Sequence, residues 1–132
     1  MRNATFEKEL SRQGVQWEYL PIVTLDFVNV QKSLANQARL EYALDDHVVQ
    51  QYTQAYRDGD EFPPLVVHRQ GKGKFILLDG NQRYAAATNA KLTKHDAYLV
   101  LSEDPIVLDR IAWSFNNNVN GLRISREECI SH

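Results

Sequence analysis

The chain of 132 residues has one cysteine, no long apolar run and almost no net charge. With Cys129 as the only cysteine, no internal disulfide can form, which suits a reducing compartment. No apolar run is long enough to cross a membrane and the N-terminus lacks a secretory pattern, so we expect a cytoplasmic protein. A formal net charge of −2 is unusual for a domain that binds duplex DNA alone. Any DNA contact should therefore be local or lie outside this chain.

The residues present are those of an ordinary globular domain, 43% hydrophobic and 24% charged. Apolar alternation predicts a strand within 17–30, and a hairpin with strands over 65–68 and 75–78. A further strand is expected over 97–101. Caps and helical spacing predict helices over the ranges 45–57, 81–90 and 102–116. This order predicts an α/β fold, with a small mixed sheet surrounded by helices.

The two ends of the chain differ from the rest. Residues 1–16 are polar with little periodicity and are expected to form a loose, flexible arm or a short helix. The main domain is expected over 17–121. Ser125 and Glu128 form a capping-box pattern, which predicts a new helix within 122–132. A helix that begins so near His132 leads us to expect that the natural protein continues beyond it.

The segment 75–87 is the strongest functional signal in the sequence. It predicts a buried strand, a tight turn at Asp79-Gly80 and a helix that begins at Asn81. The unpaired N–H groups of such a helix start can hold an anion, and Arg83 in the first turn adds a positive charge. These features indicate a phosphate site. The alternative is an ordinary turn, an ordinary helix cap and a solvated arginine.

Three separated motifs give the chain a family resemblance. They are the Gln-Ala-Arg segment 37–39, the Asp-Gly-Asn-Gln-Arg-Tyr-Ala-Ala segment 79–86, and the Asn-rich segment 117–121 followed by Ile124, Ser125 and Glu128. In this order they resemble the ParB/sulfiredoxin superfamily, and most closely the N-terminal domain of ParB-like proteins. The resemblance covers roughly Tyr19 to Glu128. It implies a ligand loop at the strand-to-helix turn.

In partition proteins of this family the three motifs surround cytidine triphosphate and its magnesium ion. The resemblance therefore implies a nucleotide-binding domain of a DNA-binding partition or regulatory protein, with DNA bound beyond residue 132 and a homodimer as the assembly. It assigns nucleotide or phosphate contacts to Gly80, Asn81, Gln82, Arg83, Gln37, Arg39, Asp79, Asn117 and Asn118. It assigns the magnesium ion to Glu128 and Asn118.

The phosphate motif departs from the family pattern in its charges. Asn81, Gln82 and Ala85 replace a glutamate and two arginines, and Gly121 replaces an arginine of the third motif. Each charge-assisted contact contributes about 1.5–3 kcal/mol, so their loss is expected to weaken triphosphate binding. Asn81 also stands where sulfiredoxins carry their reactive cysteine. The sulfinic-acid repair reaction is therefore excluded for lack of a nucleophile.

Two other functions compete with nucleotide binding. One is a phosphate-chemistry enzyme, a nuclease or a nucleoside triphosphatase or phosphotransferase, with Asp79 or Glu128 as the candidate carboxylate. The other is a dimerisation or docking domain whose ligand site has decayed. The four histidines show no metal-ligand spacing. Three cations on the hairpin loop form either a solvated turn or a contact to a phosphate backbone; they are Arg69, Lys72 and Lys74.

Overall fold

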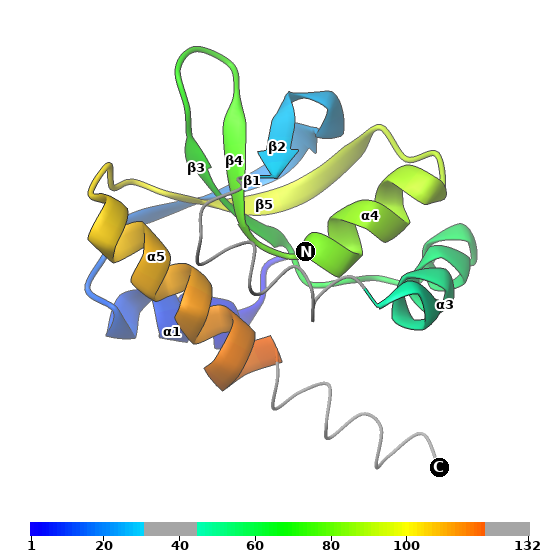
Figure 1. Cartoon of the computed structure of the whole chain (residues 1–132), viewed down its shortest axis with the longest axis horizontal. Coiled ribbons are helices and arrows are strands. Elements are labelled where there is room, and N and C mark those ends of the chain that lie inside the picture. Colours follow the sequence, from blue (N-terminus) through cyan, green and yellow to red (C-terminus); the bar gives the residue numbers. More distant parts are fainter. Residues whose placement is uncertain (31–44, 121–132) are drawn as a thin grey trace.

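Figure 1 shows the chain as a computed structural model, which describes residues 1–30 and 45–120, the last three of them by backbone alone. The helices are α1 (Ala4–Arg12), α3 (Asp46–Arg57), α4 (Asn81–Asn89) and α5 (Pro105–Ser114). The strands are β1 (Trp17–Thr24), β2 (Val28–Val30), β3 (Leu65–Arg69), β4 (Phe75–Asp79) and β5 (Lys94–Val100). A single π-helical segment, Phe115–Asn120, continues α5.

The strands form one mixed sheet in the order β1-β5-β3-β4-β2. β1 runs antiparallel to β5 and β3 antiparallel to β4, whereas β5 pairs with β3 and β2 with β4 in parallel. β3 and β4 form the hairpin that the sequence predicts. β4 passes straight into α4, so the predicted ligand loop lies at the end of a strand that has neighbours on both sides.

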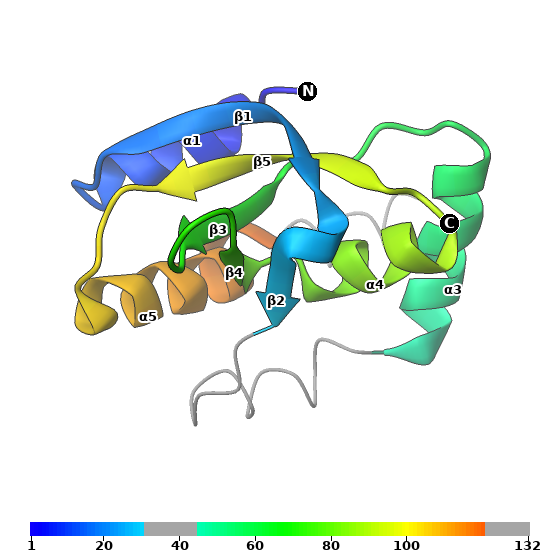
Figure 2. The same ribbon diagram turned by 90° about the horizontal axis from the view of Figure 1, so that it is seen from above.

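Helices cover both faces of the sheet, as Figure 2 shows from above. Side chains at alternate positions of a strand point to opposite faces, so one strand supplies two cores. Leu65 and Val67 of β3 pack with α3 and α4, whereas Val66 packs with α1 and α5. The result is a three-layer arrangement with buried apolar residues on both sides. It confirms the predicted α/β class.

Capping residues explain where two of the helices begin. The Asp45 carboxylate accepts hydrogen bonds from the N–H groups of His47 and Val48 at the start of α3. The Asp104 carboxylate accepts a hydrogen bond from the Ile106 N–H at the start of α5, where Pro105 is the first residue of the helix. Each cap satisfies N–H groups that have no partner within the helix. The predicted starts of these helices are confirmed.

The structure settles one open expectation and differs from another. Of the two alternatives for residues 1–16, the short helix is correct and the flexible arm is wrong, because the segment contains α1, which Asn3 caps and which buries Phe6 and Leu10 completely. Two apolar residues four positions apart lie on one helix face, and the second core forms around them. The strand expected within 17–30 is two strands, because a 3-10 turn over Leu25–Phe27 redirects the chain from β1 to β2.

Neither α1 nor any other helix within the described ranges combines the length and apolar character that crossing a bilayer requires.

Candidate functional site

The candidate ligand loop is the turn from β4 into α4. Gly80 occupies it with φ 109° and ψ 28°, a left-handed backbone conformation that residues other than glycine rarely adopt. A Cβ atom at this position would lie 2.7 Å from Leu65 Cδ2 and 3.0 Å from Arg83 Nη2. Both the backbone angle and the close packing therefore require glycine here.

The first turn of α4 begins without a side chain at its N-cap position, because Gly80 occupies that position. The first bond of the helix runs from the Tyr84 N–H to the Gly80 carbonyl oxygen at 2.7 Å. The N–H groups of residues 81, 82 and 83 precede that bond and have no partner within the helix. These groups, with the positive end of the helix dipole, are suited to a negatively charged oxygen.

The guanidinium of Arg83 does not point outward from this loop. Its Nη2 donates to Asp79 Oδ2 at 3.1 Å and to the Pro64 carbonyl oxygen at 3.0 Å. The guanidinium also lies 5.6 Å from the Phe6 ring centroid. Arg83 is only 7% exposed. Helix side chains lean toward the N-terminus, which brings residue 83 over residue 79 at the end of β4.

This geometry corrects the expectation that the Arg83 guanidinium offers its charge to a phosphate. In the structure the charge is neutralised by Asp79, and the side chain ties α4 to the chain just before β3. Asp79 is equally buried, and its Oδ2 accepts from Arg83. Arg83 Nε is buried and has no hydrogen-bond partner among the described residues.

The remaining predicted residues fall into three groups. Asn81 and Gln82 are half-buried at the start of α4, and the buried Gln82 Oε1 has no hydrogen-bond partner in the described chain. Asn117 is exposed, and its Nδ2 donates to the Trp113 carbonyl oxygen at 2.8 Å, so its amide closes the end of α5. Gln37, Arg39 and Glu128 lie outside the described residues, and Asn118 is described by its backbone alone.

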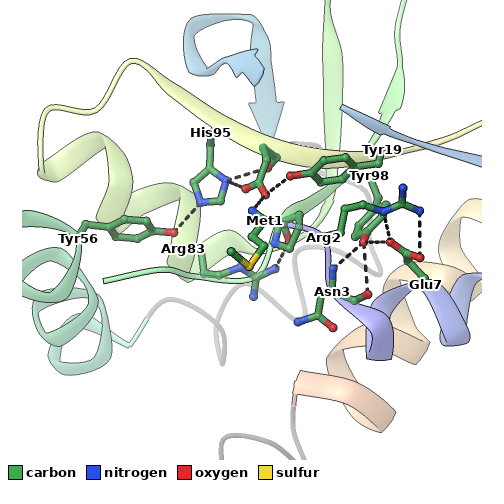
Figure 3. A network of polar contacts seen from close by, with 11 residues as sticks. Met1, Arg2, Asn3, Glu7, Tyr19, Tyr56, Arg83, His95 and Tyr98 are labelled. Carbon is green, nitrogen blue, oxygen red and sulfur yellow. Dashed lines mark hydrogen bonds and ion pairs between the residues drawn. The ribbon is translucent and has the colours of Figure 1, made fainter. Parts of the chain in front are cut away.

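A second polar cluster, which the sequence reasoning missed, joins α3 to β5 and β1. The Tyr56 hydroxyl lies 2.8 Å from His95 Nε2, and His95 Nδ1 lies 3.0 Å from Asp96 Oδ1 (Figure 3). Asp96 Oδ2 accepts from the Tyr19 hydroxyl at 2.8 Å and from the Met1 ammonium group. No local motif marks these residues, because four separate segments supply them.

The pKa values of two groups in this second cluster, Asp96 and Tyr56, depart strongly from their ordinary values. Burial alone would raise the pKa of Asp96, but hydrogen bonds from His95, the chain's ammonium group and Tyr19 lower it to about 2. Burial raises the pKa of Tyr56 well above its ordinary value. The tyrosine hydroxyl is therefore uncharged where it meets the His95 ring. A cavity of about 240 Å³ lies beside the cluster, with Phe62 and Leu92 also in its wall.

No group of three or more His, Cys, Asp or Glu suited to a metal ion occurs within residues 1–30 and 45–120.

The chain belongs to the ParB N-terminal domain family, because the sequence model of that family matches residues 11–110. The predicted membership of the ParB/sulfiredoxin superfamily is thereby confirmed. The match begins within α1 and ends within α5, and it includes the whole ligand loop. Among curated protein sequences, none matches the chain significantly.

The chain also resembles several solved structures. One is the C-terminally truncated chromosome-partitioning protein ParB from Caulobacter crescentus complexed with CTP-gamma-S, with TM-score 0.56 and 13% identity over 79% of this chain. Another is a Pnob8-like ParB-N domain, with TM-score 0.55 and 13% identity over 76% of this chain. Sulfiredoxin from Arabidopsis thaliana aligns over 64% of this chain and 83% of its own, with TM-score 0.45 and 18% identity.

The chain spans about half, 53%, of the truncated Caulobacter chain and 38% of the Pnob8-like chain. At 13% identity, the likeness to these two structures shows the fold alone.

Proposed function

We propose that this ParB-like domain binds a nucleoside triphosphate, with cytidine triphosphate and magnesium as the first pair to test. The phosphates would lie at the start of α4. One observation carries the proposal: within a ParB N-terminal domain, a left-handed glycine, Gly80, stands at the N-cap of α4 and supplies no side-chain cap to its first N–H groups. That a ParB relative of the same fold was solved with CTP-gamma-S supports the choice of nucleotide.

The charge balance of the loop determines which residues must bind the phosphates. Because Asp79 neutralises Arg83, the described part of the loop offers amides but no free cation. We assign the backbone N–H groups and the side-chain amides of Asn81 and Gln82 to the phosphate oxygens. The positive charge would come from Arg39, with Gln37 beside it, as the family resemblance implies. Magnesium would enter as the counterion of the triphosphate, with Asn118 and Glu128 as its candidate contacts.

Calorimetric titration tests this assignment. Cytidine, adenosine, guanosine and uridine triphosphates are titrated into the chain, each with and without magnesium. We expect one nucleotide to bind, and Arg39→Ala to weaken that binding by about 10- to 100-fold, the loss of one charge-assisted contact. Arg57→Ala is the matched control, since Arg57 is an exposed arginine that contacts only the Asn89 carbonyl oxygen among the described residues. Flat heats from all four nucleotides at millimolar concentration would contradict the proposal.

The Arg83–Asp79 ion pair favours one competing function, a docking or dimerisation domain whose ligand site has decayed. In that case the loop arginine has only a structural role. Sedimentation of the wild type and Arg39→Ala would distinguish the two functions. An oligomer that is the same in both proteins, with no nucleotide bound, would point to docking. Homodimerisation and a DNA contact beyond residue 132 stay predictions from the family.

A further inference from the structure

The tip of the β3–β4 hairpin is the most concentrated positive charge among the described residues. Six consecutive exposed residues, 69–74, contain three cations and no carboxylate. Arg69, Lys72 and Lys74 form no ion pair with a described residue, whereas Arg2, Arg12 and Arg83 each have a carboxylate partner. The whole chain has a net charge of −2, so this positive charge is a local feature of one turn.

The hairpin is built so that its charges stay outside the fold. Figure 1 shows the loop between β3 and β4 projecting beyond the rest of the sheet. The Gln70 N–H donates to the Lys74 carbonyl oxygen at 2.9 Å, and Gly71 and Gly73 both turn in the left-handed region. At the base of the tip, the Arg69 guanidinium lies 5.5 Å from the Phe75 ring centroid. This contact limits the freedom of the guanidinium and leaves its donors accessible.

We infer that the tip of this hairpin contacts the phosphate backbone of duplex DNA. A two-stranded β-ribbon is narrow enough to enter the major groove, and lysine and arginine at its tip then meet phosphates on the groove edges. The six residues of the tip are Arg, Gln, Gly, Lys, Gly and Lys, so the tip has no large apolar side chain to insert into a lipid bilayer. The nearest described carboxylates in sequence, Glu61 and Asp79, lie outside the six-residue tip, and Asp79 is paired with Arg83.

This surface is separate from the proposed nucleotide site. The hairpin loop precedes β4 and the ligand loop follows it, so the two lie at opposite ends of one strand (Figure 1). The inference does not depend on nucleotide binding, and the two can fail independently. It gives the domain a sequence-independent DNA contact of its own.

The magnitude follows from counterion release. Three phosphate contacts give a slope of about −2.7 in log affinity against log salt concentration. Their part of the affinity therefore falls roughly 40-fold between 50 and 200 mM salt. Removing all three cations should flatten the measured slope by about 2.7, and removing Lys72 alone by about 0.9.

Fluorescence anisotropy with a labelled 24-base-pair duplex of arbitrary sequence tests the inference on the whole 132-residue chain. The test variant is Arg69→Gln/Lys72→Gln/Lys74→Gln. The matched control, Lys8→Gln/Lys91→Gln/Lys94→Gln, removes three exposed cations from other surfaces and reaches the same net charge, −2 − 3 = −5. Circular dichroism melting checks that both triple variants fold. If the hairpin triple variant does not fold, the salt slope of Lys72→Gln alone tests the inference.

We expect the test variant to bind the duplex more weakly with a flatter salt slope, while the control keeps most of the affinity and slope. Three results would overturn the inference: no duplex binding by the wild type at 50 mM salt, equal losses in both triple variants, or a slope that the hairpin variant leaves unchanged. Vesicles containing phosphatidylserine are tested in parallel. Hairpin-dependent binding to vesicles, with none to the duplex, would also overturn it.

Discussion

Replacing Arg83 with methionine is expected to destabilise the fold before it affects any ligand. The substitution keeps much of the apolar stem but removes the guanidinium that bonds to Asp79 and to the Pro64 carbonyl oxygen. It also removes the contact with the Phe6 ring. Taking one partner out of a buried ion pair typically costs about 3–5 kcal/mol. For a domain of this size, that loss lowers the melting temperature by roughly 10 °C or more.

Urea unfolding, followed by tryptophan fluorescence and by circular dichroism, measures this loss. The exposed Arg57 provides the control, because Arg57→Met should change the free energy of unfolding by less than about 0.5 kcal/mol. The double variant Asp79→Asn/Arg83→Met should recover part of the stability, since it removes both charges of the pair. If Arg83→Met is as stable as the wild type but loses nucleotide binding, the guanidinium serves the ligand and our reasoning is wrong.

Three further predictions concern stability. Gly80→Ala should destabilise the fold by about 1–3 kcal/mol in urea unfolding, because of its left-handed φ and the close contact with Leu65; an unchanged midpoint would refute this. Hydrogen bonds from Arg12, against an opposing effect of burial, lower the pKa of Glu9 to about 2. This stabilisation, about 2 kcal/mol after solvent screening, is present above pH 4.5 and lost as the pH falls toward 2, so Glu9→Gln should flatten that acid dependence. Burial lowers the pKa of His68 below its ordinary 6.5, so stability should decline as the pH falls through 6.5, and His68→Leu should remove that decline.

The order of the elements could be predicted from the sequence because it depends on local patterns. Asp45 and Asp104 are strong caps, and the apolar alternation of β3 and β4 is regular. α1 was harder to predict, because Glu9 looks like a surface residue in the sequence. In the structure it is buried and accepts a hydrogen bond from the Ser114 hydroxyl, a residue more than a hundred positions away. No window of sequence contains such a contact.

Contacts between residues far apart in sequence also explain why the ligand loop was predicted only in part. The turn at Asp79-Gly80 and the helix that begins at Asn81 were correctly expected, since both depend on local sequence, whereas the left-handed φ of Gly80 and its close approach to Leu65 are seen only in the structure. The direction of the Arg83 side chain was not predictable from the motif, because it depends on Pro64 and Phe6, which come from distant segments. The Tyr56–His95 contact across α3 and β5 was missed for the same reason.

Nuclear magnetic resonance of the ¹⁵N-labelled chain tests the nucleotide site most directly. Cytidine triphosphate and magnesium are added together, and the amide signals of Gly80, Asn81 and Gln82 are followed. Saturable shifts at the start of α4, with the β3–β4 hairpin unmoved, are the predicted result. Shifts confined to other surfaces, or none at millimolar nucleotide, would contradict a phosphate site at this helix.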